Sequence, residues 1–489
     1  MTPFTIPIST ADVAAVGPEI ALCAFGILIL LLDAFLRASR PALPFVALAG
    51  LFVANVGSRY APGTWFSGAI ETSELTRFVD LLAVSACVLA VLGGGPLLAR
   101  DRKNQGEFYS MLLFSAAGLT LMVKGTDLLV VFVGLELMSL GLYVLAAWYR
   151  DLPESAEAGM KYFLMGALAS TVFLFGTATI YGRTGTTSLT DLVGLASSHG
   201  LLLDPMVALG LVALVAALSF KLSLVPFHSW APDVYQGMTT PGVAFLSTAP
   251  KAAALLVLVR VLHALAPEGL GEPWKPLLGL LAVASILFGN VVALAQRDVK
   301  RMLAYSGIAQ MGYAAIALAT FTDEALEGLL VFVAGYLVTN VAAFLSAAVL
   351  SNGERDAHPL ADLAGLGRVR PGAASILTLS MLSLAGLPPT VGFVGKLFVF
   401  RAAVEADLVW LAIFGIAGSL ISVGYYFRVV YFLWMKEPSR EVAMPPEDAM
   451  SGAAHLLVAA GMLVLGVFPR PLLDVARSAA SALPLGLLR

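Results

Sequence analysis

Cysteine and histidine are scarce in this sequence, and their scarcity limits the chemistry that the chain can carry. The two cysteines, Cys23 and Cys87, lie in apolar runs and are too few and too far apart for an iron–sulfur or zinc site. They fit packed or lipid-facing thiols. The five histidines are scattered without the spacing of metal ligands: His199, His228, His263, His358 and His455. We therefore expect no metal or redox centre in this chain.

Charged residues are also few, and this excludes a soluble fold. They make up 12% of the 489 residues, against roughly 25% in ordinary soluble domains, while 59% are hydrophobic and the mean hydropathy is +0.89. So much apolar surface requires the lipid bilayer as its solvent. The net charge of −3 and the lack of a basic patch interleaved with aromatic residues exclude nucleic acid as a partner. No basic leader precedes the first apolar run, so we expect no cleaved signal peptide.

The apolar runs predict an all-α integral membrane protein with about fourteen transmembrane helices in a single transmembrane domain, residues 1–489. A helix crosses about 30 Å of hydrocarbon with roughly 20 residues, and most of the runs have that length. The predicted spans are 15–37, 41–58, 76–99, 108–124, 127–149, 157–182, 203–227, 239–265, 274–295, 302–321, 325–351, 373–403, 408–435 and 450–473.

Basic residues are concentrated in loops that follow odd-numbered spans, and this distribution predicts the orientation of the chain in the membrane. The loops after spans one, three, five, nine, eleven and thirteen are expected to face the cytoplasm. An even number of spans then places both termini on the opposite, periplasmic side. The basic residues of these loops are Arg37, Arg40, Arg100, Arg102, Lys103, Arg150, Arg297, Lys300, Arg301, Arg355, Arg368, Arg370, Lys436 and Arg440.

A weak internal repeat relates the two halves of the chain. Lys221 precedes Pro226 in span seven, and Lys396 follows Pro388 and Pro389 in span twelve, 175 residues later. Five spans separate the pair, an odd number, so one copy would be inverted, and paired interrupted helices in inverted halves point to a transport site. The predicted parts are N-terminal helices 1–107, repeats 108–265 and 274–435, and a C-terminal helix in 436–489. The alternative is coincidence in a chain with 26 prolines.

Four charged residues fall near the middle of predicted spans: Glu136, Lys221, Lys251 and Lys396. Each costs about 2.5–3.5 kcal/mol on insertion scales unless it meets protein, water or a partner. Burial disfavours the charged form, and an adjacent opposite charge restores it, so such groups can exchange protons through water. We interpret the four as a proton relay. The alternative is a static ion pair, or lysines that bind backbone carbonyls freed by the prolines.

Other polar residues are candidates for a smaller part. His228, expected in the loop that closes span seven, could carry protons to Lys221, or could be an interface histidine. Lys161 and Glu154, at the cytoplasmic start of span six, are expected to be solvated, or could mark a proton entry. Charges near span ends are expected to reach the membrane surface by snorkelling: Glu19, Asp33, Asp80, Arg401 and Arg428.

Four segments resemble the antiporter-like membrane subunits of respiratory complex I. They are EAGMKYFLMGALAS (157–170), FKLSLVPFHSWAPDVYQGMTTPGVAFLSTAPKAA (220–253), QRDVKRMLAYSGIAQMGY (296–313) and GLPPTVGFVGKLFVF (386–400). The similarity runs from about residue 100 to 435. It implies that Glu136 is the pairing glutamate, Lys221 the switching lysine, Lys251 the central lysine and Lys396 the terminal lysine of the relay. Tyr305 and Gln310 lie in the third segment and are possible accessory residues.

The resemblance implies a proton-pumping subunit of a bacterial NADH:quinone oxidoreductase in the cytoplasmic (inner) membrane. Its expected partners are the other membrane-arm and redox subunits, and NADH, FMN, iron–sulfur clusters and quinone are expected in those partners. The chain is most similar to subunit N, because its terminal relay residue is Lys396 and little sequence follows span fourteen. Gln310 departs from the histidine of many relatives and cannot itself take up a proton. A subunit of a multisubunit sodium/proton antiporter and a non-pumping scaffold subunit remain alternatives.

Overall fold

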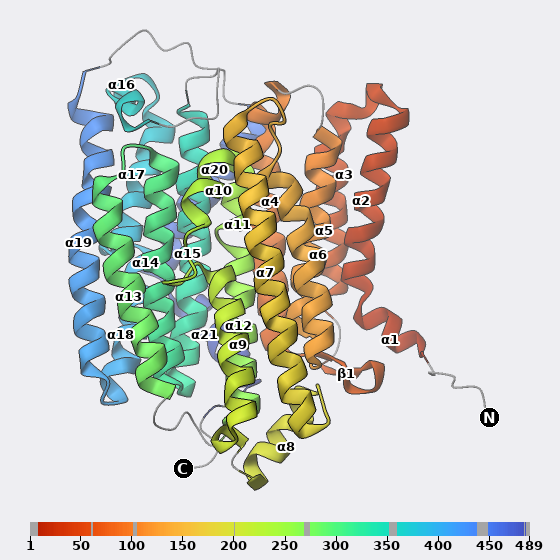
Figure 1. Ribbon diagram of the computed structural model, residues 1–489. Coiled ribbons are helices and arrows are strands. Elements are labelled where there is room, and N and C mark those ends of the chain that lie inside the picture. The colour runs from red at the N-terminus through yellow and green to blue at the C-terminus, as the bar shows by residue number, and fades with distance from the viewer. Residues whose placement is uncertain are drawn as a thin grey trace.

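The computed structural model describes residues 8–59, 62–100, 105–199, 201–267, 274–351, 359–437, 448–483 and 485, which form a bundle of long helices (Figure 1). The hairpin of β1 and β2 and the helix α8 lie at one end, called here the hairpin end, and α16 lies at the other, called the α16 end (Figure 1). His358 and four of the basic loop residues, Arg102, Lys103, Arg355 and Arg440, lie outside the described residues.

The elements of the first half are α1 (Thr10–Ala15), α2 (Gly17–Phe35), α3 (Leu43–Gly57), β1 (Gly63–Trp65), β2 (Ile70–Thr72), α4 (Glu74–Arg100), α5 (Gln105–Lys124), α6 (Leu128–Ala146), α7 (Pro153–Thr184), α8 (Leu189–His199), α9 (Pro205–Leu222), α10 (Ala231–Gly237), α11 (Thr240–Leu246) and α12 (Ala249–Leu265). Those of the second half are α13 (Trp274–Ala295), α14 (Val299–Thr320), α15 (Asp323–Val349), α16 (Leu366–Val369), α17 (Pro371–Ala385), α18 (Val391–Glu405), α19 (Val409–Met435), α20 (Ala449–Val467) and α21 (Arg470–Ala480). Short 3-10 turns occupy Arg37–Ala42, Phe66–Gly68, Leu201–Leu203 and Leu360–Leu363.

The prediction of about fourteen membrane-spanning helices is confirmed. Within the described part of the chain, thirteen helices are long and apolar enough to cross a membrane. The remaining predicted span, 373–403, is divided into α17 and α18, each of 15 residues, so that only the pair together covers the thickness of a bilayer. The inverted relationship between the two halves stays a prediction.

Span seven is interrupted near the middle of the bundle. Asp204 begins α9 by accepting hydrogen bonds from the backbone of Met206 and Val207, and the helix ends when Ser223 turns left-handed at φ 60°. The chain then continues as α10 in the same direction (Figure 1). The span therefore extends to Gly237, ten residues beyond its predicted end, and His228 lies inside the interruption rather than in a closing loop.

Spans eight and twelve are interrupted as well. Gly386, at φ 82°, ends α17 in the left-handed region that glycine adopts without strain, and α18 begins five residues later. The interruption of span eight at Ser247 and Thr248, between α11 and α12, was not predicted. Asn340 of α15 donates a hydrogen bond to Ser247 at 2.7 Å, so the break is held by a buried polar contact.

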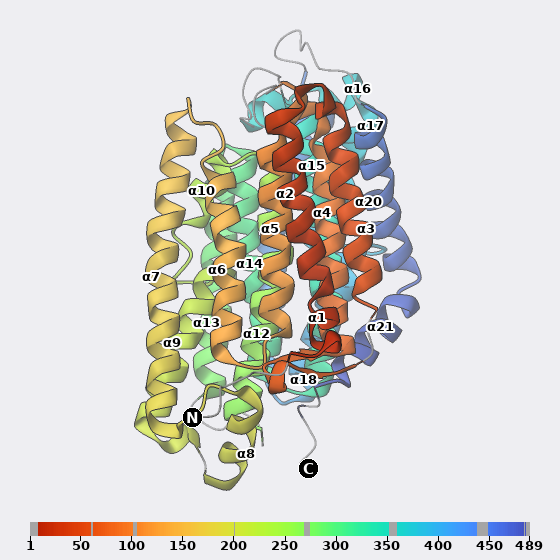
Figure 2. The ribbon, with the colours of Figure 1, turned by 90° about the vertical axis from the view of Figure 1, so that its right-hand side faces the viewer.

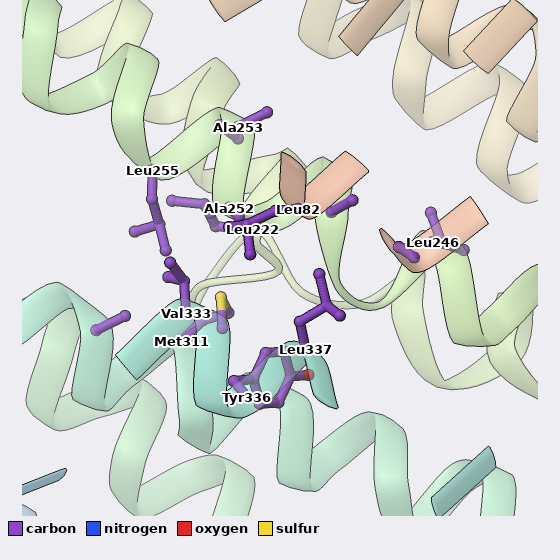
Figure 3. Packing of buried hydrophobic residues seen from close by; sticks show 14 of the residues in the cluster. Leu82, Leu222, Leu246, Ala252, Ala253, Leu255, Met311, Val333, Tyr336 and Leu337 are labelled. Carbon is purple, nitrogen blue, oxygen red and sulfur yellow. The ribbon is translucent and has the colours of Figure 1, made fainter. Parts of the chain in front are cut away.

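Span eight is the most enclosed of the candidate membrane spans, because all 18 residues of its most apolar stretch are buried in the protein. Figure 3 shows side chains of α12, including Ala252 and Leu255, on one side of this core and Met311 of α14 and Val333 of α15 on the other. Figure 2 shows α7 and α20 at opposite flanks of the bundle, with α2 and α3 between them. Span eight thus lies deep in the protein rather than against lipid, whereas α9 and α18 also carry exposed apolar side chains such as Met206 and Leu397.

Candidate functional site

The four predicted relay residues lie on α6, α9, α12 and α18. The three lysines are enclosed, with 4% of Lys221, 1% of Lys251 and 4% of Lys396 exposed, whereas Glu136 is only half-buried. Three of the four elements border an interruption: α9 ends at one, and α12 and α18 begin at one. Broken helices leave backbone groups that need polar partners, so polar side chains gather where the bundle would otherwise be apolar.

Lys221 and Glu136 do not form a direct ion pair. The Lys221 ammonium donates a hydrogen bond to the hydroxyl of Ser139 at 2.7 Å, and the Glu136 carboxylate accepts one from Ser170 on α7. Within the described residues, no contact of 4.0 Å or less joins the two charged groups. Ser139 and Glu136 are three positions apart on α6 and so share one face of that helix. The Ser139 hydroxyl therefore lies on the same face of α6 as Glu136 and takes the place of the carboxylate as the hydrogen-bond partner of Lys221.

An aromatic row connects Lys221 with Lys251. The Lys221 ammonium lies 5.6 Å from the ring centroid of Tyr162, which stacks on Trp230 at 4.6 Å. Trp230 meets Tyr235 edge-on at 6.4 Å, and the ring of Tyr235 lies 5.7 Å from the Lys251 ammonium. Rings at these distances can stabilise a cation through their electron-rich faces, so both lysines can carry charge without a carboxylate in contact.

Lys251 has no hydrogen-bond partner among the described residues, and neither have the hydroxyls of Tyr235 and Tyr336. All three groups surround Gly307 on α14. A Cβ placed there would lie 3.2 Å from the Tyr336 oxygen, 3.5 Å from the Lys251 nitrogen and 4.0 Å from the Tyr235 oxygen. Buried polar groups seldom lack partners, and water is the usual partner where several converge. Because Gly307 has no side chain, the Lys251 amine and the two tyrosine hydroxyls all face the position that a side chain would occupy there.

Lys396 is held by the end of the helix that precedes it. Its ammonium donates to the carbonyl of Leu384 at 2.8 Å, one of the carbonyls left free where α17 ends, and lies 4.5 Å from the ring centroid of Tyr313. Gln310 donates to the same carbonyl at 3.0 Å. Gln310 and Gly307 are three positions apart on α14, so one face of this helix borders both Lys251 and Lys396.

The predicted accessory residues are separated from one another. Lys161 lies near the α16 end and contacts Asp233 at 2.6 Å, and Asp233 contacts Arg301 at 2.7 Å. His228, in the break of span seven, lies against Phe288 with the ring centroids 4.5 Å apart, and the ring of Tyr305 lies 6.4 Å from the same phenylalanine. Because no described polar contact joins His228 to Lys221, its shuttle role stays a prediction.

The prediction that Glu19 and Asp80 reach the membrane surface is wrong. Both are buried, 7% and 3% exposed, and both contact Lys124, at 2.8 and 3.3 Å. Their helices, α2, α4 and α5, pack together, which linear spacing did not reveal. Arg428 donates to the carbonyls of Leu294 and Gln296 at the end of α13. The only sequence signal was that Glu19 and Asp80 each stand inside an apolar run.

Known proteins share both the sequence and the fold of this chain. Residues 125–422 match the family described as NADH:quinone oxidoreductase/Mrp antiporter, TM. NADH-quinone oxidoreductase subunit N of Trichlorobacter lovleyi is 38% identical over 474 residues, which cover 96% of this chain and 97% of that protein.

Two solved structures extend the comparison. A chain of respiratory complex I from Thermus thermophilus with bound Aureothin is similar at a TM-score of 0.80 and 33% identity, covering 94% of this chain and 99% of that one. A chain of the Mrp complex from Dietzia sp. DQ12-45-1b reaches a TM-score of 0.83 at 21% identity over 97% of this chain and 98% of that one, a likeness of fold alone.

Proposed function

Because the chain belongs to the family of NADH-quinone oxidoreductase subunit N, within the NADH:quinone oxidoreductase/Mrp antiporter membrane proteins, we propose that it is a proton-translocating membrane-arm subunit of that oxidoreductase. The observation that supports proton transfer is the set of enclosed amines with polar groups between them. Lys221, Lys251 and Lys396 are each at most 4% exposed, and each borders an interrupted helix. Titratable groups inside a membrane protein are costly and mark ion pathways.

In this proposal the path runs from Glu136, past Ser139, to Lys221, then to Lys251 and along α14 to Lys396. Lys251 has no protein hydrogen-bond partner among the described residues, and the two tyrosine hydroxyls beside it have none either, so water held there would carry a proton onward. Gln310 cannot take up a proton, but its amide shares the Leu384 carbonyl with Lys396 and fixes the end of the path.

In this proposal the redox reactions that drive proton translocation take place in other subunits of the oxidoreductase. Other membrane-arm and redox subunits of the oxidoreductase are the partners, and they supply NADH oxidation, FMN, iron–sulfur clusters and quinone reduction. The described basic loop residues follow the ends of α2, α6, α13 and α19 or lie in and beside α16, and these helix ends are at the α16 end of the bundle (Figure 1). In this proposal that end faces the cytoplasm of a bacterial cell and the hairpin end faces the periplasm. The chain then works in the cytoplasmic (inner) membrane.

A sodium/proton antiporter subunit is less well supported, because the likeness to the Mrp complex is one of fold at 21% identity. A scaffold whose charges only fix packing is a second alternative. The absence of a direct Glu136–Lys221 contact weakens it, since a packing role for the pair would require them to meet. Proton transport that requires NADH separates the proposed function from the antiporter.

A double variant, Lys221→Met with Glu136→Gln, tests the relay against the scaffold. Both changes keep side-chain volume and remove the ability to exchange protons. We expect NADH-driven proton uptake into inverted membrane vesicles to fall by at least about a hundredfold, because a positioned proton-transfer group contributes roughly 10²–10⁴-fold. Assembly of the oxidoreductase should be retained, as measured by native gel electrophoresis.

The matched control is Lys436→Met with Glu437→Gln, which makes the same chemical change at two exposed residues after α19. This control should pump at the wild-type rate. Wild-type pumping by an assembled Lys221/Glu136 double variant would contradict the relay and favour the scaffold.

The space beside Gly307 gives a second prediction. Gly307→Ala adds one methyl group 3.2 Å from the Tyr336 oxygen, a contact that the flexible end of the tyrosine can relieve, so the fold should be retained. The methyl group displaces water from the space between Lys251 and the two tyrosines. We expect the pumping rate to fall several-fold while the complex remains assembled. An unchanged rate would show that the space takes no part in proton transfer.

A further inference from the structure

A second group of buried charges lies at the hairpin end, separate from the proposed relay. Lys124, the last residue of α5, contacts Glu19 in the first turn of α2 at 2.8 Å and Asp80 of α4 at 3.3 Å. Only 2% of Lys124, 7% of Glu19 and 3% of Asp80 is exposed. These three residues are called the triad below.

The triad has an excess of acid. One ammonium can balance one carboxylate, which leaves the second negative charge without a counter-charge in a place screened from water. One oxygen of each acid, Oε2 of Glu19 and Oδ1 of Asp80, is buried without a hydrogen-bond partner among the described residues. An uncompensated buried charge is strongly destabilising, whereas a proton on one of these oxygens removes the charge.

The neighbouring charges do not supply the missing positive charge. On α4, Glu74 and Arg77 pair with each other at 3.5 Å, and Glu71 of β2 pairs with Arg260 of α12 at 2.9 Å. Each pair is neutral in sum. The other titratable groups of the packed elements include exposed Arg59 after α3, Cys23 on α2, Cys87 on α4 and His263 on α12. On α21, which packs against α4, Arg470 and Asp474 are exposed and Arg477 pairs with Glu327 of α15 at 3.2 Å.

The triad is also within reach of water. A narrow cleft at the protein surface, with room for about one water molecule, is lined by both Asp80 and Lys124. Hydroxyl groups of Ser58, Ser73 and Thr76 line the same cleft, and the half-exposed Glu74–Arg77 pair stands on its wall. A proton leaving the triad therefore has polar groups along its way to the surface.

We propose that the triad is a proton-exchange site that holds one extra proton on its two carboxylates and exchanges it with water at the hairpin end. In the exchange, a carboxylic acid O–H bond breaks, the electron pair stays on the carboxylate, and cleft water accepts the proton. The ammonium of Lys124 occupies the position between the acids and repels a metal cation. The inference does not depend on the relay or on partner subunits.

Infrared difference spectroscopy of the full chain in lipid nanodiscs tests this site. All samples carry Glu136→Gln, so that the relay glutamate contributes no signal. We expect a carbonyl stretching band of a protonated carboxylic acid that shifts in D₂O and disappears as the pH rises. Asp80→Asn and, separately, Glu19→Gln should each abolish the titrating band, and Lys124→Met should add a second protonated acid.

The matched control is Asp33→Asn. Asp33 is a largely buried acid whose charge is already balanced by Arg40 at 2.7 Å, so the band should be unchanged. A band that persists in both Asp80→Asn and Glu19→Gln, or the absence of any titrating band in the parent chain, would overturn the proposal. A titration that shifts when sodium replaces choline would overturn it in favour of a cation site. Glu19→Gln keeps the test valid if Asp80→Asn does not fold.

Discussion

Replacement of Lys251 by methionine is expected to abolish NADH-driven proton translocation while leaving the complex assembled. Lys251 is 1% exposed and its amine lies beside Gly307. It is the one amine on the proposed path between Lys221 and Lys396 among the described residues. Methionine has a similar length and an apolar character suited to the buried surroundings. Because a positioned proton-transfer group contributes roughly 10²–10⁴-fold, we expect the pumping rate to fall at least about a hundredfold.

Lys300→Met is the contrasting control for Lys251. Lys300 is equally buried, 1% exposed, but it donates a hydrogen bond to the carbonyl of Met238 at 2.6 Å and lies near the α16 end. Its replacement leaves that carbonyl without its lysine donor, so the loss should appear in the thermal stability of the chain. Pumping by an assembled Lys251→Met variant at more than half the wild-type rate would remove Lys251 from the path.

Gly118→Leu is expected to prevent the chain from accumulating in the membrane. A Cβ at Gly118 of α5 would lie 2.2 Å from the backbone nitrogen of Met138 on α6, and one at Gly134 would lie 2.4 Å from the nitrogen of Met122. Small residues at such crossings allow two transmembrane helices to approach closely. Since backbone atoms cannot move aside as a side chain can, the helices must separate, at a cost of about 1–3 kcal/mol or more.

The measurement is the amount of full-length chain in purified membranes and its melting temperature in detergent. Gly182→Leu is the matched control, because no atom lies within 4 Å of a Cβ at that position. It should accumulate like the wild type. A Gly118→Leu chain with wild-type yield and melting temperature would show that the α5–α6 crossing tolerates separation. Because α5 ends at Lys124 and α6 carries Glu136, a separated pair should also disturb both groups of buried charges.

The number of spans and the enclosure of the three lysines could be predicted from the sequence, because both follow from the cost of polar groups in lipid. Apolar runs of about 20 residues define the spans without tertiary information. Lys221, Lys251 and Lys396 stood out for the same reason, since a charge in the middle of such a run must face protein.

Contacts between distant spans could not be predicted. Ser139, and not Glu136, receives the Lys221 hydrogen bond, and this depends on the rotation of α6 about its axis, which a uniformly apolar helix does not reveal. The partnership of Glu19 and Asp80 with Lys124 likewise depends on which helices are neighbours. His228 was misplaced because the polar stretch after Pro226 is typical of a loop, although here it is an interruption within a span.

The complete enclosure of span eight has a consequence for biosynthesis. Its neighbours α4, α5 and α9 precede it in the chain, whereas α15, which packs against α11, follows it by more than fifty residues. The ribosome therefore synthesises the helix that carries Lys251 and Arg260 well before α15, which covers one side of span eight, has been made. Until residues 323–349 have been inserted, one side of this helix must remain sheltered by the translocation machinery or by lipid.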